Sequence, residues 1–157
     1  MTATKVIGES VKQTNRTFIK SYVEDYAKAI TENYRRYHLN TLNGNLHGNY
    51  PEYAREQLDA IENGTANLMK FKVYTGKRYY KIVQQEFQTW EGSRNYGKYA
   101  DGSVHCFVDK ETGDVYKPAS WSAPAKHIRF TFQNVDHLKF LLNPDNVGWA
   151  GGYLYIR

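Results

Sequence analysis

Large apolar and aromatic side chains recur every fourth residue between positions 18 and 34, and this spacing constrains the fold more than any other feature. The stripe consists of Phe18, Tyr22, Tyr26, Ile30 and Tyr34. Four residues advance an α-helix by slightly more than one turn, so the stripe follows one side of a helix. The sequence therefore predicts an amphipathic helix from about Arg16 to His38, with residues 1–14 as a polar arm before it.

A second, shorter helix is predicted after a loop. Residues 39–50 are rich in Asn and Gly, a composition that favours a loop. Pro51 follows, and proline suits the first turn of a helix. Asn63 and Gly64 then supply residues typical of a helix C-terminus. The segment 15–64 is therefore predicted to be helical apart from this loop.

After Gly64 the period of the hydrophobic pattern changes to two, which predicts half-exposed β-strands. Strands are expected at residues 69–74, 78–87, 104–108, 115–117, 128–132 and 153–157. The polar segment 88–103 is expected to be a long loop. The segment Val135–Leu142 is expected to be a short helix with Asn134 as its N-cap.

The order of the predicted elements indicates an α+β fold. We expect a mainly antiparallel sheet packed against the long N-terminal helix and the second shorter helix. The 157 residues suit a single domain, with an arm at 1–14, a helical part at 15–64 and a β-rich part at 67–157. Cys106 is the one cysteine, so no intramolecular disulfide can form. No apolar run reaches the length of a membrane span, so no membrane partner is expected.

The net charge of +5 is unevenly distributed along the chain. Residues 1–66 carry eight basic and eight acidic side chains, whereas residues 67–157 carry thirteen basic and eight acidic ones. Such an asymmetry points to an anionic partner of the β-rich part. A net charge of this size also serves solubility, so charge alone names no partner.

The hairpin 70–81 is the best candidate for a binding surface. It contains five basic residues and no acidic one, with tyrosines among them. Nucleic acid, either DNA or RNA, requires cations for its phosphates and flat rings on which its bases stack. A second basic group follows at 117–129. The predicted nucleic-acid-binding residues are Lys70, Lys72, Tyr74, Lys77, Arg78, Tyr80, Lys81, Lys117, Lys126 and Arg129.

The same lysines and tyrosines also suit two roles that involve no nucleic acid. The lysines of the hairpin could instead protect an exposed edge strand against aggregation. The 14 tyrosines exceed what a small core can bury with every hydroxyl satisfied, which also favours a protein-binding surface. We expect Tyr22, Tyr26 and Tyr34 to lie at the edge of the core with their hydroxyl groups in water.

Motifs for catalysis, metals or cofactors are absent from the sequence. The five histidines lack the spacing of metal ligands, and Cys106 has no second cysteine beside it. No nucleophile or phosphate-loop motif occurs. We therefore assign no catalytic residue, metal or cofactor. A small enzyme with a site near residues 101–137 stays an alternative, since carboxylates there could be paired by the fold.

The segment FVDKETGDVYKPASWSAPAKH, residues 107–127, resembles a motif of small uncharacterised proteins encoded by tailed phages. The similarity extends to residues 103–130 and to the ending GGYLYIR, residues 151–157. The resemblance implies a phage origin, with a location in the host cytoplasm or the virion, and it carries no activity. We therefore predict a non-enzymatic phage accessory protein that binds nucleic acid without strong sequence preference. The alternative is a protein-binding module, either a virion component or an inhibitor of a host enzyme.

Overall fold

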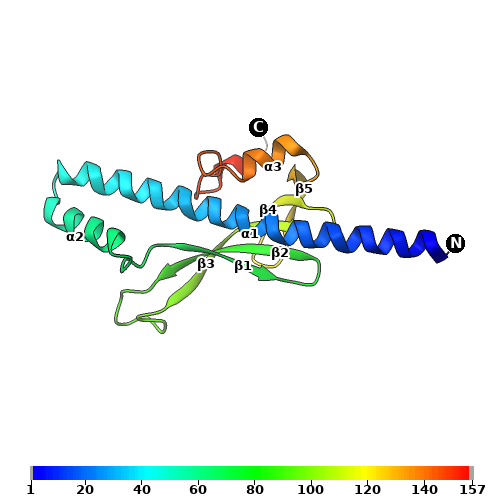
Figure 1. The fold of residues 1–157 in the computed structure, drawn as a ribbon. Helices are drawn as coiled ribbons and strands as arrows, with labels where there is room; N and C mark the ends of the chain where they lie inside the picture. Colours follow the sequence, from blue (N-terminus) through cyan, green and yellow to red (C-terminus); the bar gives the residue numbers. More distant parts are fainter. Residues whose placement is uncertain (1, 156–157) are drawn as a thin grey trace.

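The computed structural model describes residues 2–155, with side chains from residue 16 onward, and it confirms the α+β class. The helical elements are α1 (Thr2–Leu46), α2 (Pro51–Glu62), α3 (Val135–Leu141) and the 3-10 helix η1 (Gly152–Leu154). The strands are β1 (Lys70–Thr75), β2 (Tyr79–Phe87), β3 (Tyr99–Asp109), β4 (Asp114–Pro118) and β5 (Pro124–Thr131). Figure 1 shows α1 running along the whole molecule, with the sheet on one side of it and α2 folded back beside its C-terminal half.

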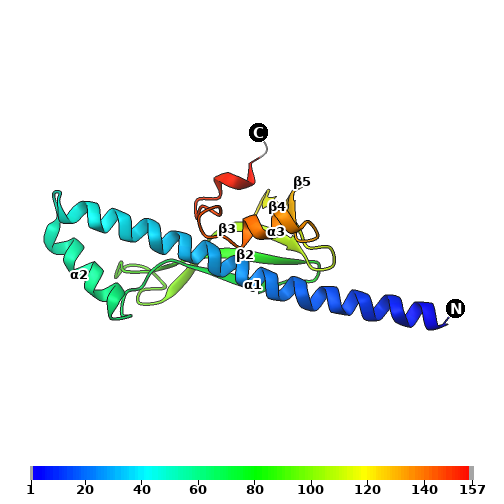
Figure 2. The ribbon, with the colours of Figure 1, turned by 45° about the horizontal axis from the view of Figure 1, so that its top comes forward.

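Helix α1 is longer at both ends than predicted. The expected arm is wrong for residues 2–14, which are helical, while residue 1 lies outside the described residues. Each residue added to an existing helix gains one backbone hydrogen bond, so a packed helix extends readily into a segment without proline. This N-terminal part of α1 projects beyond the sheet in both ribbon views (Figure 1, Figure 2).

The predicted loop at 39–50 is correct only for its last four residues. Helix α1 continues through Asn43 and Gly44 to Leu46. Leu42 and Ala54 are fully buried where α1 and α2 pack together, and α2 begins at Pro51 as predicted. Burial of these side chains outweighs the low helix propensity of Asn and Gly, which amounts to at most about 1 kcal/mol per residue.

The five strands form one antiparallel sheet in sequence order, β1-β2-β3-β4-β5. The loop predicted at 88–103 is too long, because β3 begins at Tyr99. Phe87 and Tyr99 are paired in register, and their rings lie 5.4 Å apart. The β3–β4 turn contains Gly113 at φ +75°, a conformation that glycine adopts without steric strain.

The C-terminal segment does not form the predicted strand. Its described part folds as the helix η1, and residues 156–157 lie outside the described residues. Leu154 is fully buried in the core that α1 and the sheet form. This segment packs on the sheet through side chains, and the backbone bends at Gly151, whose φ is +82°.

Helix α3 forms as predicted, with the Asn134 side chain accepting hydrogen bonds from two backbone N–H groups.

The core lies between α1 and the sheet. Its α1 side is the predicted stripe together with its neighbours, and its sheet side comes from the central strands. Tyr26 corrects one expectation, because this side chain is completely buried and its hydroxyl contacts the hydroxyl of Tyr153, not water. Tyr22 and Tyr34 are half-buried. No helix among residues 2–155 combines the length and the apolar character that a membrane span needs.

Candidate nucleic-acid interface

The strand registers divide the sheet into a face against α1 and an opposite face, which we call the open face. One row of mutually paired residues crosses all five strands on the open face: Tyr74, Lys81, Phe107, Tyr116 and Ile128. The next row of paired residues along the strands faces α1. It consists of Thr75, Tyr80, Val108, Val115 and Phe130. Neighbouring residues in a strand point to opposite faces, so the predicted site residue Tyr80 lies in the core, where it is 5% exposed.

A hollow of about 420 Å³ lies on the open face between the β1–β2 turn and the connection from β4 to β5. It is lined by Tyr74, Thr75, Gly76, Lys77, Arg78, Tyr79, Lys81, Asp101, Phe107, Trp121 and Ser122. Four of these lining residues were predicted to bind nucleic acid. Tyr74, Lys77 and Arg78 lie at or beside the hairpin turn, and Lys81 lies on β2.

Aromatic rings form the floor and one wall of this hollow. Phe107 is almost fully buried, and the ring of Tyr79 packs edge-on against it at 5.9 Å. Tyr79 also meets Tyr116 at 6.1 Å. Trp121 stands at the wall with 46% of its surface exposed. Rings with free surface beside cations can stack on the bases of a nucleic acid.

Several cations of the open face lie over an aromatic ring. The Lys81 ammonium is 3.9 Å from the centre of the Trp121 ring, and it donates a hydrogen bond of 3.1 Å to the Trp121 carbonyl oxygen. Lys72 lies 4.7 Å from the Tyr74 ring, and the Arg78 guanidinium 5.2 Å from the Tyr79 ring. These contacts hold each cation next to a flat ring without neutralising its charge.

One carboxylate lines the hollow, although the hairpin itself contains none. Asp101 of β3 accepts hydrogen bonds from the Tyr74 hydroxyl at 2.8 Å and from Gln85 Nε2 at 2.7 Å. The hydrogen bond from Gln85 lowers the pKa of Asp101, the bond from Tyr74 and the nearby lysine charges lower it further, and partial desolvation opposes them. The Asp101 carboxylate is therefore ionised at neutral pH.

A second basic hollow adjoins the first, because Lys77 and Arg78 line both. Its volume is about 630 Å³, and its remaining lining residues are Arg16, Asp109, Lys110, Glu111 and Thr112. The sequence did not predict Arg16 or Lys110 here, since they come from α1 and the β3–β4 turn. Antiparallel pairing brings the two turns to the same end of the sheet, a proximity that no local pattern reveals.

The acidic residues of this second hollow are already engaged. Asp109 accepts hydrogen bonds from the backbone N–H groups of Glu111 and Thr112, and it lies 3.7 Å from Arg78 Nε. Glu111 forms an ion pair with Arg16. These contacts stabilise the β3–β4 turn, and the two carboxylates reduce the positive charge of the hollow by two. Because both carboxylates already have partners, they make a poor pair for acid–base chemistry.

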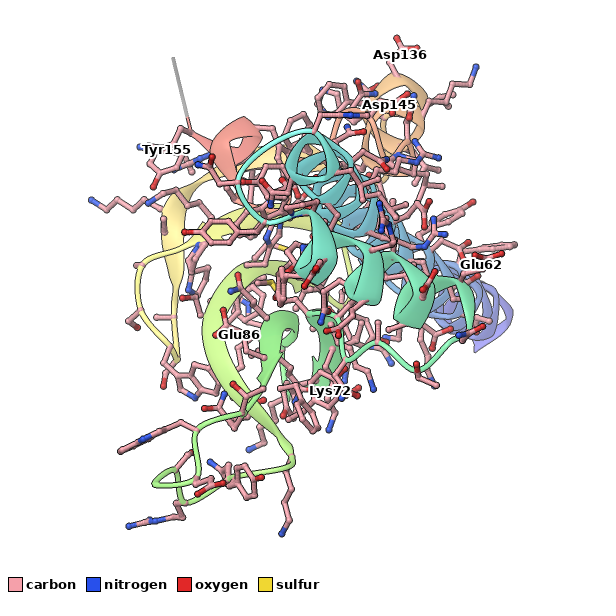
Figure 3. The ribbon with its side chains drawn as sticks, turned by 90° about the vertical axis from the view of Figure 1, so that its left-hand side faces the viewer. Glu62, Lys72, Glu86, Asp136, Asp145 and Tyr155 are labelled. Carbon is pink, nitrogen blue, oxygen red and sulfur yellow. The ribbon has the colours of Figure 1, made fainter. Side chains whose placement is uncertain are left out.

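The cations predicted at 117–129 do not join the hairpin cations in one hollow. Lys117 lies 4.6 Å from the ring of Tyr155, and Arg129 donates a hydrogen bond of 2.7 Å to the Leu154 carbonyl oxygen. Figure 3 shows Tyr155 and Lys72 at separate edges of the molecule. Lys126 is exposed on β5. The contact between Lys81 and Trp121 is what connects the hairpin with the segment 117–129.

Lys70 belongs to the open face by alternation, but it lies outside both hollows. Its ammonium group is 4.1 Å from the ring of Tyr99, near the other end of the sheet. The structure therefore gathers Tyr74, Lys77, Arg78 and Lys81 in one place. Lys72 lies beside this group, because its ammonium contacts the ring of Tyr74.

Metal-binding and nucleophilic side chains are dispersed in the part of the chain that the structure describes. Within that part, no three His, Cys, Asp or Glu side chains come close enough to hold a metal ion. Cys106 is fully buried, and burial raises the pKa of its thiol to about 12, so the thiol is not ionised at neutral pH. Burial also lowers the pKa of His105 to about 4, partly offset by a hydrogen bond with the backbone of Trp149.

The sequence model of DUF7717, a protein family of unknown function, matches residues 6–156. The match covers nearly the whole chain, so the protein belongs to this family. No curated protein and no solved structure matches the chain.

Proposed function

We propose that this member of the family binds single-stranded nucleic acid across the open face of its sheet. The observation that supports the proposal is the hollow in which three cations and several partly exposed rings line one surface. Single-stranded nucleic acid needs this combination, because its phosphates are anionic and its unpaired bases expose flat faces. The partly exposed rings of Tyr74, Tyr79 and Trp121 suit unpaired bases better than a rigid duplex.

The phosphates would follow the cations from one hollow to the next. Lys77 and Arg78 line both hollows, with Lys81 on one side and Lys110 on the other. Four such contacts predict that the logarithm of the association constant falls against the logarithm of salt concentration with a slope of about −3. Because most of the binding energy is then electrostatic, affinity depends only weakly on sequence.

Fluorescence anisotropy with labelled single-stranded DNA, single-stranded RNA and duplex DNA tests this proposal, with salt varied between about 50 and 200 mM. We expect both single strands to bind more tightly than the duplex, with the slope given above. Absence of salt-dependent binding to every probe at the lowest salt would overturn the proposal.

A pair of neutralising variants locates the surface. Lys77→Gln removes a cation that lines both hollows, and it should reduce the salt slope by about one. Lys117→Gln makes the same change in charge beside Tyr155, away from the open face, and should leave the slope unchanged. Equal effects of the two variants would show that net charge, not this surface, controls binding.

The phage role is a further part of the proposal and is supported by the sequence resemblance of residues 107–127. We propose an accessory protein that acts in the host cytoplasm or the virion. Mass spectrometry of purified particles separates these locations: a fixed copy number indicates a virion component, and absence from particles indicates action in the infected cell.

A second candidate function is protein binding through the loop at 88–98. Trp90 is 72% exposed and Tyr96 is 52% exposed on this loop, and aromatic residues are enriched at protein interfaces. Cross-linking in infected cells, comparing the natural protein with a Trp90→Ala variant, tests this function. A partner that is lost with Trp90 while nucleic-acid binding is retained would support two separate surfaces.

A further inference from the structure

We infer that Asp101 gives the hollow a preference for guanine among the bases of a single strand. The inference rests on the proposed function, since it concerns the same hollow, and it adds a modest base preference to binding that is otherwise independent of sequence. The observation that carries it is the position of one carboxylate among three cations and several aromatic rings.

Asp101 is held in a defined position at the edge of the hollow. It lies on β3 opposite Gln85 of β2, and the side chains of Gln85 and Tyr74 both donate hydrogen bonds to it. Each contact restrains a carboxylate that is otherwise exposed. The donor groups of a ligand in the hollow therefore meet acceptor oxygens that are already oriented.

The carboxylate keeps acceptor capacity for a ligand. Two carboxylate oxygens offer about four lone-pair directions. Gln85 occupies one direction, and the single hydroxyl proton of Tyr74 is shared between the two oxygens at 2.8 and 2.9 Å. A ligand with two adjacent donors would take the place of the Tyr74 hydroxyl proton, which lies between the two oxygens, while Gln85 keeps its hydrogen bond to Oδ1.

Guanine matches this acceptor better than the other bases. Its Watson–Crick edge carries two adjacent donors, N1–H and the N2 amino group, which can both point to one carboxylate. Adenine and cytosine each offer a single amino donor beside an acceptor nitrogen. Thymine and uracil place carbonyl oxygens on both sides of their one N–H, and these oxygens repel a carboxylate.

The neighbouring rings favour the same base. Trp121 and Tyr74 line the hollow on the same side of the sheet as Asp101. A purine covers more of an aromatic ring than a pyrimidine does, so stacking adds to the preference for guanine over the pyrimidines. Lys77 and Arg78 line the same hollow and would contact the phosphates that flank the stacked base.

A purely structural role for Asp101 makes a different prediction. The hydrogen bonds from Tyr74 and Gln85 need only an acceptor oxygen, which an asparagine side chain also supplies. Asp101→Asn can therefore keep the local hydrogen bonds, whereas it removes the charge and one of the two acceptors that guanine would use. Thermal unfolding of this variant checks that the fold is retained.

The experiment compares a labelled oligothymidylate with the same oligonucleotide carrying guanine, inosine or adenine at its central positions, by fluorescence anisotropy at constant salt. We expect the natural protein to bind the guanine probe about five- to tenfold more tightly than oligothymidylate, the lower end of the discrimination known for a two-hydrogen-bond base contact. Inosine, which lacks the N2 amino group, should be intermediate.

Asp101→Asn should reduce the guanine preference to about one, while binding of oligothymidylate is maintained or strengthened because a negative charge is removed. Asp25→Asn is the matched control, since it makes the same charge change on the exposed surface of α1 and should keep the preference. Competition by GMP and by AMP against bound oligothymidylate tests the natural protein without any variant, and GMP should compete better.

The outcomes separate the inference from the proposed function. If the natural protein binds all probes equally, or if Asp101→Asn keeps the guanine preference, the inference about Asp101 is overturned and the proposed function stands. If the natural protein binds none of the probes at low salt, the proposed function itself is overturned, and the inference with it.

Discussion

The hydroxyl group of Tyr26 on α1 lies 2.5 Å from the hydroxyl group of Tyr153 in the C-terminal segment, 127 residues later in the chain. The Tyr153 hydroxyl also lies 2.7 Å from His105 Nε2, and the His105 ring hydrogen-bonds to the backbone of Trp149. Tyr26 also hydrogen-bonds to the Cys106 side chain. This buried network joins α1, β3 and the C-terminal segment, and the neutral His105 ring supplies one donor and one acceptor nitrogen to it.

Tyr26→Phe tests the energetic contribution of this network. The change removes the buried hydrogen bond to Tyr153 and the weaker one with the Cys106 thiol, and it leaves Tyr153 with His105 as its partner. We expect the free energy of unfolding to fall by about 1 kcal/mol, the usual net value of such a bond. Urea denaturation measures the change. Tyr22→Phe, on the half-buried part of the same stripe, should change stability by less than about 0.5 kcal/mol.

Stability should fall in mild acid because of His105. Burial lowers its pKa from 6.5 to about 4, so the unfolded chain binds this proton more tightly than the folded protein does. The stabilisation is complete above pH 6.5, and it is lost as the pH falls from 6.5 toward 4. At about 1.4 kcal/mol per pKa unit, the loss from this residue amounts to about 3 kcal/mol.

The contribution of His105 can be separated from that of the carboxylates with a variant. His105→Gln keeps a polar side chain at the site but cannot titrate, so its stability should depend less on pH between 4 and 6.5 than that of the natural protein. Urea unfolding at a series of pH values gives both curves. Parallel curves for the two proteins would show that His105 is not responsible.

Gly113→Ala should destabilise the protein strongly. This glycine has φ +75°, and a Cβ atom there would lie 2.9 Å from Cβ of Phe132. Backbone strain and the steric clash together predict a loss of roughly 2 to 4 kcal/mol. Gly64→Ala is the matched control, since Gly64 has φ +73° but no atom within 4 Å of the added Cβ. It should lose only about 1 to 2 kcal/mol, from strain alone.

Trp121→Ala should weaken binding of single-stranded nucleic acid while it leaves the fold intact. The Trp121 ring is 46% exposed at the wall of the hollow and carries the Lys81 contact. Loss of one stacked base predicts an affinity about five- to hundredfold lower in anisotropy titrations. Trp90→Ala, on the exposed loop at 88–98, should bind like the natural protein. If both variants bind normally, the bases do not stack at Trp121.

Local sequence patterns were sufficient to predict most elements. The stripe at Phe18 to Tyr34 and the alternation after Gly64 have periods that suit only a helix and strands, respectively. Pro51 and Asn134 marked helix starts correctly, since their chemistry acts within a single turn. The errors lie where the pattern is weak: residues 2–14 and 39–46, and the C-terminal segment.

The failure at residues 153–155 has a physical reason. Tyr153 and Leu154 alternate with neighbours as a strand would, but the described C-terminal segment pairs with neither edge strand, β1 or β5. In the described C-terminal segment, Leu154 is instead buried in the core, and the Tyr153 hydroxyl hydrogen-bonds to His105 in the buried network. Burial of these side chains, which involves residues from α1 and β3, decided its conformation.

The sequence by itself determined the helix, the strands and the faces on which their residues alternate, because each depends on side chains a few positions apart. It also determined that the hairpin 70–81 carries cations beside rings. Only the tertiary structure decided that Tyr80 faces the core, that Lys117 and Arg129 turn to the C-terminal segment, and that Asp101 and Trp121 complete the hollow. These relationships depend on strand register and sheet order, which bring together residues that are distant in the chain.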